Sequence, residues 1–156
     1  MEKTTRRTFL QTGALGTVYL LGIPHSHSVS QDLQTDEKSR VILIRDKGLI
    51  DNEGNINKEI LEKMVDEGVR TLFQTATPED AWKKVVKPED VVGIKSNVSG
   101  PPRTPVELED ILKTKIINAG VSSDKVSVDD RGVLRNPIFQ NSTALINVRP
   151  MRTHHW

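Results

Sequence analysis

The stretch Val91-Val92-Gly93-Ile94-Lys95 decides the fold class of this chain of 156 residues. It is a short apolar run, rich in β-branched residues, between Pro88-Glu89-Asp90 and an irregular loop, and this pattern predicts a buried strand. Continuous apolar runs are typical of strands that are buried on both faces of a parallel sheet. Three further predicted strands share this character: Val41-Ile42-Leu43-Ile44, Val126-Ser127-Val128 and Ala144-Leu145-Ile146-Asn147-Val148.

The segments between the predicted strands carry helical signals. Asn57 is a candidate N-cap for a helix that runs to Phe73, because apolar residues recur there at helical spacing. Thr77-Pro78 places a cap residue before a proline and opens a shorter helix. Thr104-Pro105-Val106-Glu107 is interpreted as a capping box with proline at the first helical position, and Gly120 as the stop of that helix.

Strands therefore alternate with helices along the chain. This order predicts an α/β fold, with a mostly parallel sheet of about four strands and helices on its faces. In such sheets the ligand crevice lies beyond the carboxyl ends of the strands. Three segments are expected to meet there: residues 95–104, 129–131 and 149–155.

Cations and polar groups at this edge predict a site for a small anion. Lys95 and Asn97 follow a strand, and Arg103 and Thr104 precede a helix N-terminus, where backbone N–H groups favour a phosphate or carboxylate. Arg131 joins them from the next strand end. The five residues are the candidate ligand-binding set, and the alternative is ordinary capping with solvated charges.

Carboxylates and histidines at the same edge form a candidate metal set. Asp129 and Asp130 follow a strand and offer hard oxygen ligands. His154 and His155 are the histidines that remain outside the N-terminal export segment, and either could ligate a metal or act as an acid or base. The alternatives are a strand-ending turn with a local ion pair for the aspartates, and solvent exposure for the histidines.

The N-terminus predicts export. Arg6 and Arg7 precede Thr-Phe-Leu, as in twin-arginine signals, and the weakly apolar stretch that follows is too short to span a bilayer. We therefore expect a signal at residues 1–30, cleaved after Ser30, a linker at 31–40 and an α/β domain at 41–156. The translocase would be a partner and the periplasm the destination. The alternatives are an uncleaved membrane anchor and a basic tail that leads into a short core helix.

Composition excludes two classes of protein. The chain has no cysteine, so it contains neither a disulfide nor a cysteine-ligated iron–sulfur cluster. Of its 22 basic and 21 acidic residues, three basic and one acidic lie in residues 1–30, which leaves 19 basic and 20 acidic residues. Such a balance gives no basic patch for nucleic acid. A metal ion stays a candidate cofactor, since many twin-arginine substrates load one before export.

Four stretches, in order and spacing, resemble the family called domain of unknown function 362, in its twin-arginine-exported branch. They are Pro78-Glu79-Asp80-Ala81-Trp82, residues 91–97, Asn118-Ala119-Gly120 with Val128-Asp129-Asp130-Arg131, and residues 144–155. The resemblance covers essentially all of residues 41–156. Members of the family are usually much longer, so it implies that this chain ends, after Thr153-His154-His155, part-way through a family domain.

Three interpretations of function remain open from the sequence. The first is an exported protein of this family that binds a metal or a small anionic ligand at the carboxyl ends of its strands, with or without catalysis. The second is a truncated, non-catalytic fragment. The third is a solute-binding or partner-binding module. The residues do not decide whether the chain is an enzyme.

Overall fold

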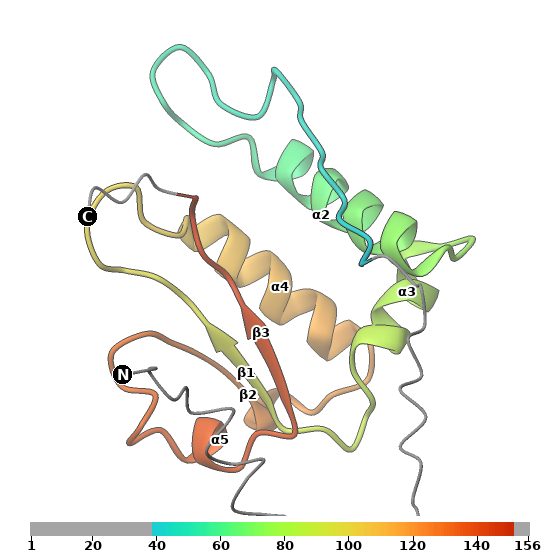
Figure 1. The fold of residues 1–156 in the computed structure, drawn as a ribbon, viewed down its shortest axis with the longest axis vertical. Helices are drawn as coiled ribbons and strands as arrows, with labels where there is room; N and C mark the ends of the chain where they lie inside the picture. The colour runs from blue at the N-terminus through green and yellow to red at the C-terminus, as the bar shows by residue number, and fades with distance from the viewer. Residues whose placement is uncertain (1–38, 152–156) are drawn as a thin grey trace, which may run out of the picture. The chain divides into compact units, whose positions relative to one another are not determined.

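The predicted strand at residues 91–95 forms the centre of a three-stranded parallel sheet (Figure 1). In the computed structural model, which describes residues 39–151, β1 (Val92–Lys95) pairs with β2 (Val126–Asp129) on one side and with β3 (Ala144–Asn147) on the other. Helices flank the sheet. The predicted α/β class is confirmed, with three strands in place of about four.

Two predicted helices begin where their caps indicate. At the start of α2 (Lys58–Phe73), the Asn57 side chain accepts a hydrogen bond from the N–H of Ile60 at 3.1 Å. At the start of α3 (Pro78–Val85), the Thr77 hydroxyl accepts from the N–H of Asp80 at 3.2 Å. Each bond satisfies one of the N–H groups that a helix leaves unpaired at its first turn.

Helix α4 (Val106–Asn118) ends as predicted but begins differently. Gly120, at φ 111°, follows the helix, and the N–H groups of Gly120 and Val121 donate to the carbonyls of Ile117 and Ile116, as in a Schellman motif. The predicted capping box at Thr104 is wrong. Pro105 is the N-cap and no side chain caps the helix, because the Thr104 hydroxyl accepts from the N–H of Asn97.

The two faces of the sheet are covered to different extents. Alternate strand residues, including the fully buried Val92 and Ile94, face α4 and pack with Ile116 in the core. On the opposite face lies the single-turn helix α5 (Pro137–Gln140), whose Phe139 ring sits over Gly93. The core of the described unit therefore lies between the sheet and α4. Its buried members are Trp82, Val86, Val92, Ile94, Leu112, Ile116, Ala119, Val121 and Val126.

The chain reverses direction across the sheet after β2. From β1 it crosses through α4 and the short 3-10 helix η1 (Ser123–Lys125) to β2, and from β2 it returns past β1 through α5 to β3. Right-handed crossovers in opposite directions place their helices on opposite faces, as seen for α4 and α5. The loops that leave β1 and β2 therefore diverge to opposite faces, which makes the carboxyl ends of these two strands a topological switch point.

The predicted strand at residues 41–44 is wrong. This segment is extended and has no strand partner within the described part of the chain. It runs beside α2: the Arg40 guanidinium donates to the carbonyl of Leu72 at 3.3 Å, and the methyl end of Ile44 lies against Gly68. Val41 and Leu43 are largely exposed. An apolar, β-branched run can be buried against a helix as well as in a sheet, so its composition alone did not identify its neighbour.

The predicted signal at residues 1–30 and the histidines at the C-terminus lie outside the described residues. The same holds for most of the predicted linker at 31–40, of which residues 39 and 40 are described and belong to no helix or strand. Within residues 39–151, none of the helices has the length and apolar character needed to cross a bilayer.

Candidate functional site

An ion pair between Lys95 and Asp130 lies at the switch point and links the end of β1 to the turn after β2. The Lys95 ammonium group contacts the Asp130 carboxylate and also donates to the carbonyl of Ser96 at 2.7 Å. The backbone N–H of Val98 donates to the other carboxylate oxygen at 2.9 Å. The Lys95 hydrogen bond, followed by that from Val98, holds the pKa of Asp130 below its usual value. Asp130 therefore links the loop after β1 to the turn after β2.

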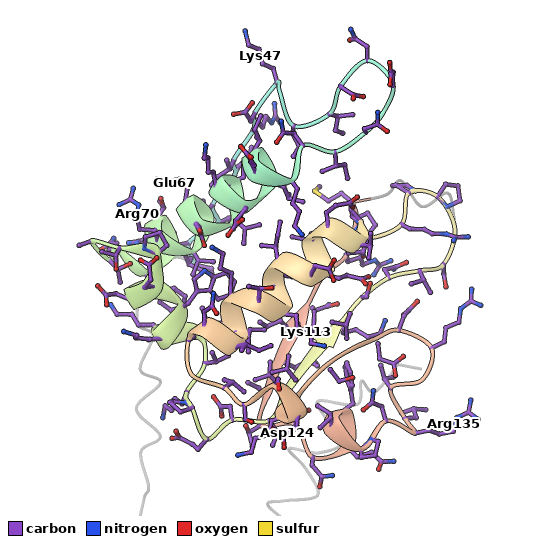
Figure 2. The ribbon with its side chains drawn as sticks, turned by 180° about the vertical axis from the view of Figure 1, so that it is seen from behind. Lys47, Glu67, Arg70, Lys113, Asp124 and Arg135 are labelled. Carbon is purple, nitrogen blue, oxygen red and sulfur yellow. The ribbon has the colours of Figure 1, made fainter. Side chains whose placement is uncertain are left out.

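This ion pair differs from the surface pair on α2. Figure 2 shows Glu67 and Arg70 together on α2; they lie three residues apart on one helix, and their side chains are 50% and 38% exposed. Such pairs contribute little to stability. Lys95 and Asp130 are 35 residues apart in sequence, and the Asp130 side chain is only 13% exposed. The Lys95–Asp130 pair therefore constrains tertiary structure at the sheet edge.

Asp129 points into a different set of hydrogen bonds. Its carboxylate accepts from the N–H of Gly132 at 2.8 Å and from the side-chain amide of Asn136 at 3.0 Å. The Asn136 bond, followed by that from Gly132, lowers the pKa of Asp129. Asn136 also caps α5 through the N–H of Ile138. Asp129 thus fixes the turn that leads into α5.

The structure gives the predicted metal set no further support. The two aspartates bond to different partners, and within residues 39–151 no three His, Asp or Glu side chains are grouped to hold a metal ion. His154 and His155 lie outside the described residues. The metal hypothesis therefore stays a prediction that rests on those two histidines.

The loop after β1 is braced against α4 and β3. Asn97 and Thr104 bond to each other twice: the Asn97 N–H donates to the Thr104 hydroxyl at 3.1 Å, and the Thr104 N–H donates to the Asn97 carbonyl at 2.9 Å. The Val148 N–H donates to the Lys95 carbonyl at 2.8 Å. The buried Ser96 hydroxyl is hydrogen-bonded to Glu109 of α4. These bonds hold the loop after β1 together and fasten it to α4 and to the end of β3.

A hollow of about 300 Å³ opens beside this bracing, at the carboxyl ends of β1 and β3. We call it the edge hollow. Lys95 and Asn147 are register partners on neighbouring parallel strands, so both side chains lie on the face of the sheet that carries α5. Both charged lining residues, Lys95 and Arg149, are cations. The lining residues are Lys95, Ser96, Asn97, Leu145, Asn147, Val148 and Arg149.

The structure brings together part of the predicted ligand set. Lys95 and Asn97 line the edge hollow. Thr104 is buried, braces the loop and does not line the hollow. Arg103 and Arg131 are exposed on their loops and do not line it. The export residues Arg6 and Arg7 lie outside the described part of the chain.

Leu145, Asn147 and Asn136 were not among the predicted site residues, whereas Arg149 begins the segment 149–155 that was expected to meet residues 95–104 at this edge. Leu145, Asn147 and Arg149 line the edge hollow, and Asn136 anchors Asp129. The sequence did contain a pattern that could have identified Asn136, because Asn before Pro137 is typical of an N-cap followed by proline at the first helical position. Asn147 carried a weaker one, as the polar residue that ends an apolar strand run. Leu145 carried none, because nothing in the sequence shows that the sheet face at β3 is only partly covered.

A second polar cluster ties the helices together behind the sheet. The Lys115 ammonium lies 2.7 Å from carboxylate oxygens of both Asp66 and Glu62, and the Trp82 indole N–H donates to Asp66 at 2.9 Å. Asp66, Trp82 and Lys115 come from α2, α3 and α4, and each finds a partner within the cluster. A buried polar group that is satisfied in this way indicates a structural role.

Comparison with family models, with curated proteins and with solved structures returned no match. The resemblance to domain of unknown function 362 therefore stays a prediction that rests on the stretches quoted above.

Proposed function

We propose that this chain is an exported protein that binds a small anionic ligand in the edge hollow. The observation that carries the proposal is the meeting of Lys95 and Arg149 in one hollow at the carboxyl ends of parallel strands. Ligands of open α/β sheets bind beyond the carboxyl ends of the strands, and the edge hollow lies at this end of the sheet, next to the switch point between β1 and β2.

The polar lining suits an oxyanion. Lys95 and Arg149 supply positive charge, and the amides of Asn97 and Asn147 supply further hydrogen-bond donors. The volume, about 300 Å³, lies at the small end of the range for ligand pockets, so the hollow suits a small ligand. The Asp130 carboxylate holds Lys95 from the side of the switch point and neutralises part of its charge. We therefore expect modest affinity.

The test is isothermal titration calorimetry of the full chain with inorganic phosphate and acetate. Lys95→Met should weaken binding about tenfold or more, because it removes one charge-assisted hydrogen bond. Arg149→Met should also weaken binding. Lys113→Met is the matched control, since Lys113 is exposed on α4 and does not line the hollow. Loss of affinity in the control alone, or no binding by the wild-type chain, contradicts the proposal.

Export is tested separately. The proposal rests on Arg6-Arg7 and on the short apolar stretch after them. Replacement of both arginines by lysine should leave the chain in the cytoplasmic fraction, while the wild-type chain reaches the periplasmic fraction. Equal distribution of the two chains rejects the twin-arginine route and leaves the anion site untouched.

A further inference from the structure

The edge hollow has an apolar side as well as a polar one. Leu145 lies two residues before Asn147 on β3, so the two side chains share a sheet face. Leu145 is 61% exposed and lines the hollow together with Lys95 and Arg149. A single exposed leucine is ordinary on a protein surface. This one lines a hollow whose two charged lining residues are both cations.

The apolar surface of this sheet face continues from Leu145 to α5. Gly93 of β1 is the register partner of Leu145, and a methyl group at Gly93 would stand 3.2 Å from the Leu145 side chain. It would stand 2.9 Å from the Phe139 ring, which therefore occupies the space that a side chain would take. Leu145 and Phe139 consequently flank Gly93 and form one apolar strip on this face.

The polar and apolar parts lie in line along the strands. Lys95 and Asn147 are register partners at the carboxyl end of the strands. Gly93 and Leu145 are the register partners two residues before them. Two residues of strand span about 6.6 Å. A ligand that places an anionic head between Lys95 and Arg149 can extend a short chain over Leu145.

From this arrangement we infer that the edge hollow selects a small monocarboxylate with a short aliphatic chain. The inference rests on the proposed anion site and names the class of its ligand. The carboxylate is bound by Lys95 and Arg149, and the aliphatic chain covers Leu145 and removes its exposed surface from water. Phosphate or sulfate, which has no apolar part, contacts only the polar end and leaves Leu145 exposed.

The test compares acetate, butyrate and hexanoate with inorganic phosphate by calorimetry on the full chain. In the wild-type chain each added methylene should tighten binding by about two- to fourfold until the chain passes Leu145. Leu145→Asn should abolish this gain, so that acetate, butyrate and hexanoate bind with equal affinity. Leu134→Asn is the matched control, because Leu134 is exposed and does not line the hollow. Butanol, which has the chain without the charge, should not bind measurably.

The outcomes distinguish failure of the proposed anion site from failure of the inferred preference for monocarboxylates. Binding of phosphate and acetate, with no gain from acetate to hexanoate, overturns the inference and leaves the anion site standing. The inference is also overturned if Leu145→Asn and Leu134→Asn reduce the gain equally, or if butanol binds as well as butyrate. Absence of binding for all four anions overturns the anion site and the inference together. Circular dichroism of each variant checks that the fold is retained.

Discussion

Lys95 and Asp130 form an ion pair that joins the carboxyl end of β1 to the turn after β2. Lys95 also lines the edge hollow between β1 and β3, whereas Asp130 does not. One cation is thus shared between a structural carboxylate and a candidate ligand site. Replacement of Asp130 is therefore expected to lower the stability of the fold and to raise the affinity for anions.

Asp130→Asn should weaken the fold and strengthen anion binding. The substitution removes the charge that neutralises Lys95 but keeps an oxygen that can accept from the Val98 N–H. We expect a lower urea midpoint and an affinity for phosphate raised about three- to tenfold. Asp110→Asn, on the exposed side of α4, is the charge-matched control. Weaker phosphate binding by Asp130→Asn would show that the carboxylate itself is needed in the site.

The contribution of Asp130 to stability should disappear in acid. Its folded-state pKa is depressed, mainly by the Lys95 hydrogen bond, so its stabilising effect is present above the usual aspartate value of about 3.9 and is lost as pH falls through the lower folded value. The urea midpoints of the wild-type chain and Asp130→Asn should differ at pH 7 and converge below about pH 4. A constant difference down to pH 2 would contradict the assignment.

Gly93→Ala should destabilise the chain by about 1–3 kcal/mol, the usual cost of overpacking. The added methyl group would stand 2.9 Å from the Phe139 ring. Phe139→Leu in the same chain should recover part of the loss, since it removes the clashing ring atoms. Chemical denaturation of both single variants and the double variant gives the coupling energy. Additive losses would mean that Phe139 does not pack over Gly93.

Asp66→Ala should cost about 1–3 kcal/mol, because it leaves the buried Trp82 indole N–H without its acceptor. Asp66→Asn retains an acceptor oxygen for Trp82 and should cost less, although it loses the charge that faces Lys115. Equal losses for the two variants would assign the effect to the ion pair with Lys115. Thermal unfolding followed by circular dichroism measures both.

Local signals predicted much of the fold. The run at residues 91–95 and the two runs after it are strands because they are apolar, β-branched and bounded by loops. Asn57, Thr77 and Gly120 act as the caps that their residue types indicate. The segment at 41–44 has a similar composition and is no strand: it lies along α2, with Val41 and Leu43 largely exposed. An apolar composition therefore does not identify the element that a run packs against.

The candidate site, like the fold, is predicted in part by local sequence patterns and depends in part on tertiary structure. Lys95 and Asn97 were predicted because they directly follow a strand. Thr104 was predicted as a cap and ligand, yet its hydroxyl bonds to Asn97 across a loop whose path the residue types do not encode. Arg149 and Asn147 come to Lys95 only through the return of the chain to the far side of β1. Strand order, which no local pattern specifies, decides which polar residues meet.

The most direct test of the anion site is a nuclear magnetic resonance titration of the isotope-labelled full chain with inorganic phosphate. Binding in the edge hollow should produce chemical-shift changes that saturate together at the amides of Asn97, Asn147, Val148 and Arg149. No such change is expected in α2, which α4 separates from the sheet. Saturable shifts centred on α2, or none at the edge hollow, would contradict the proposed site.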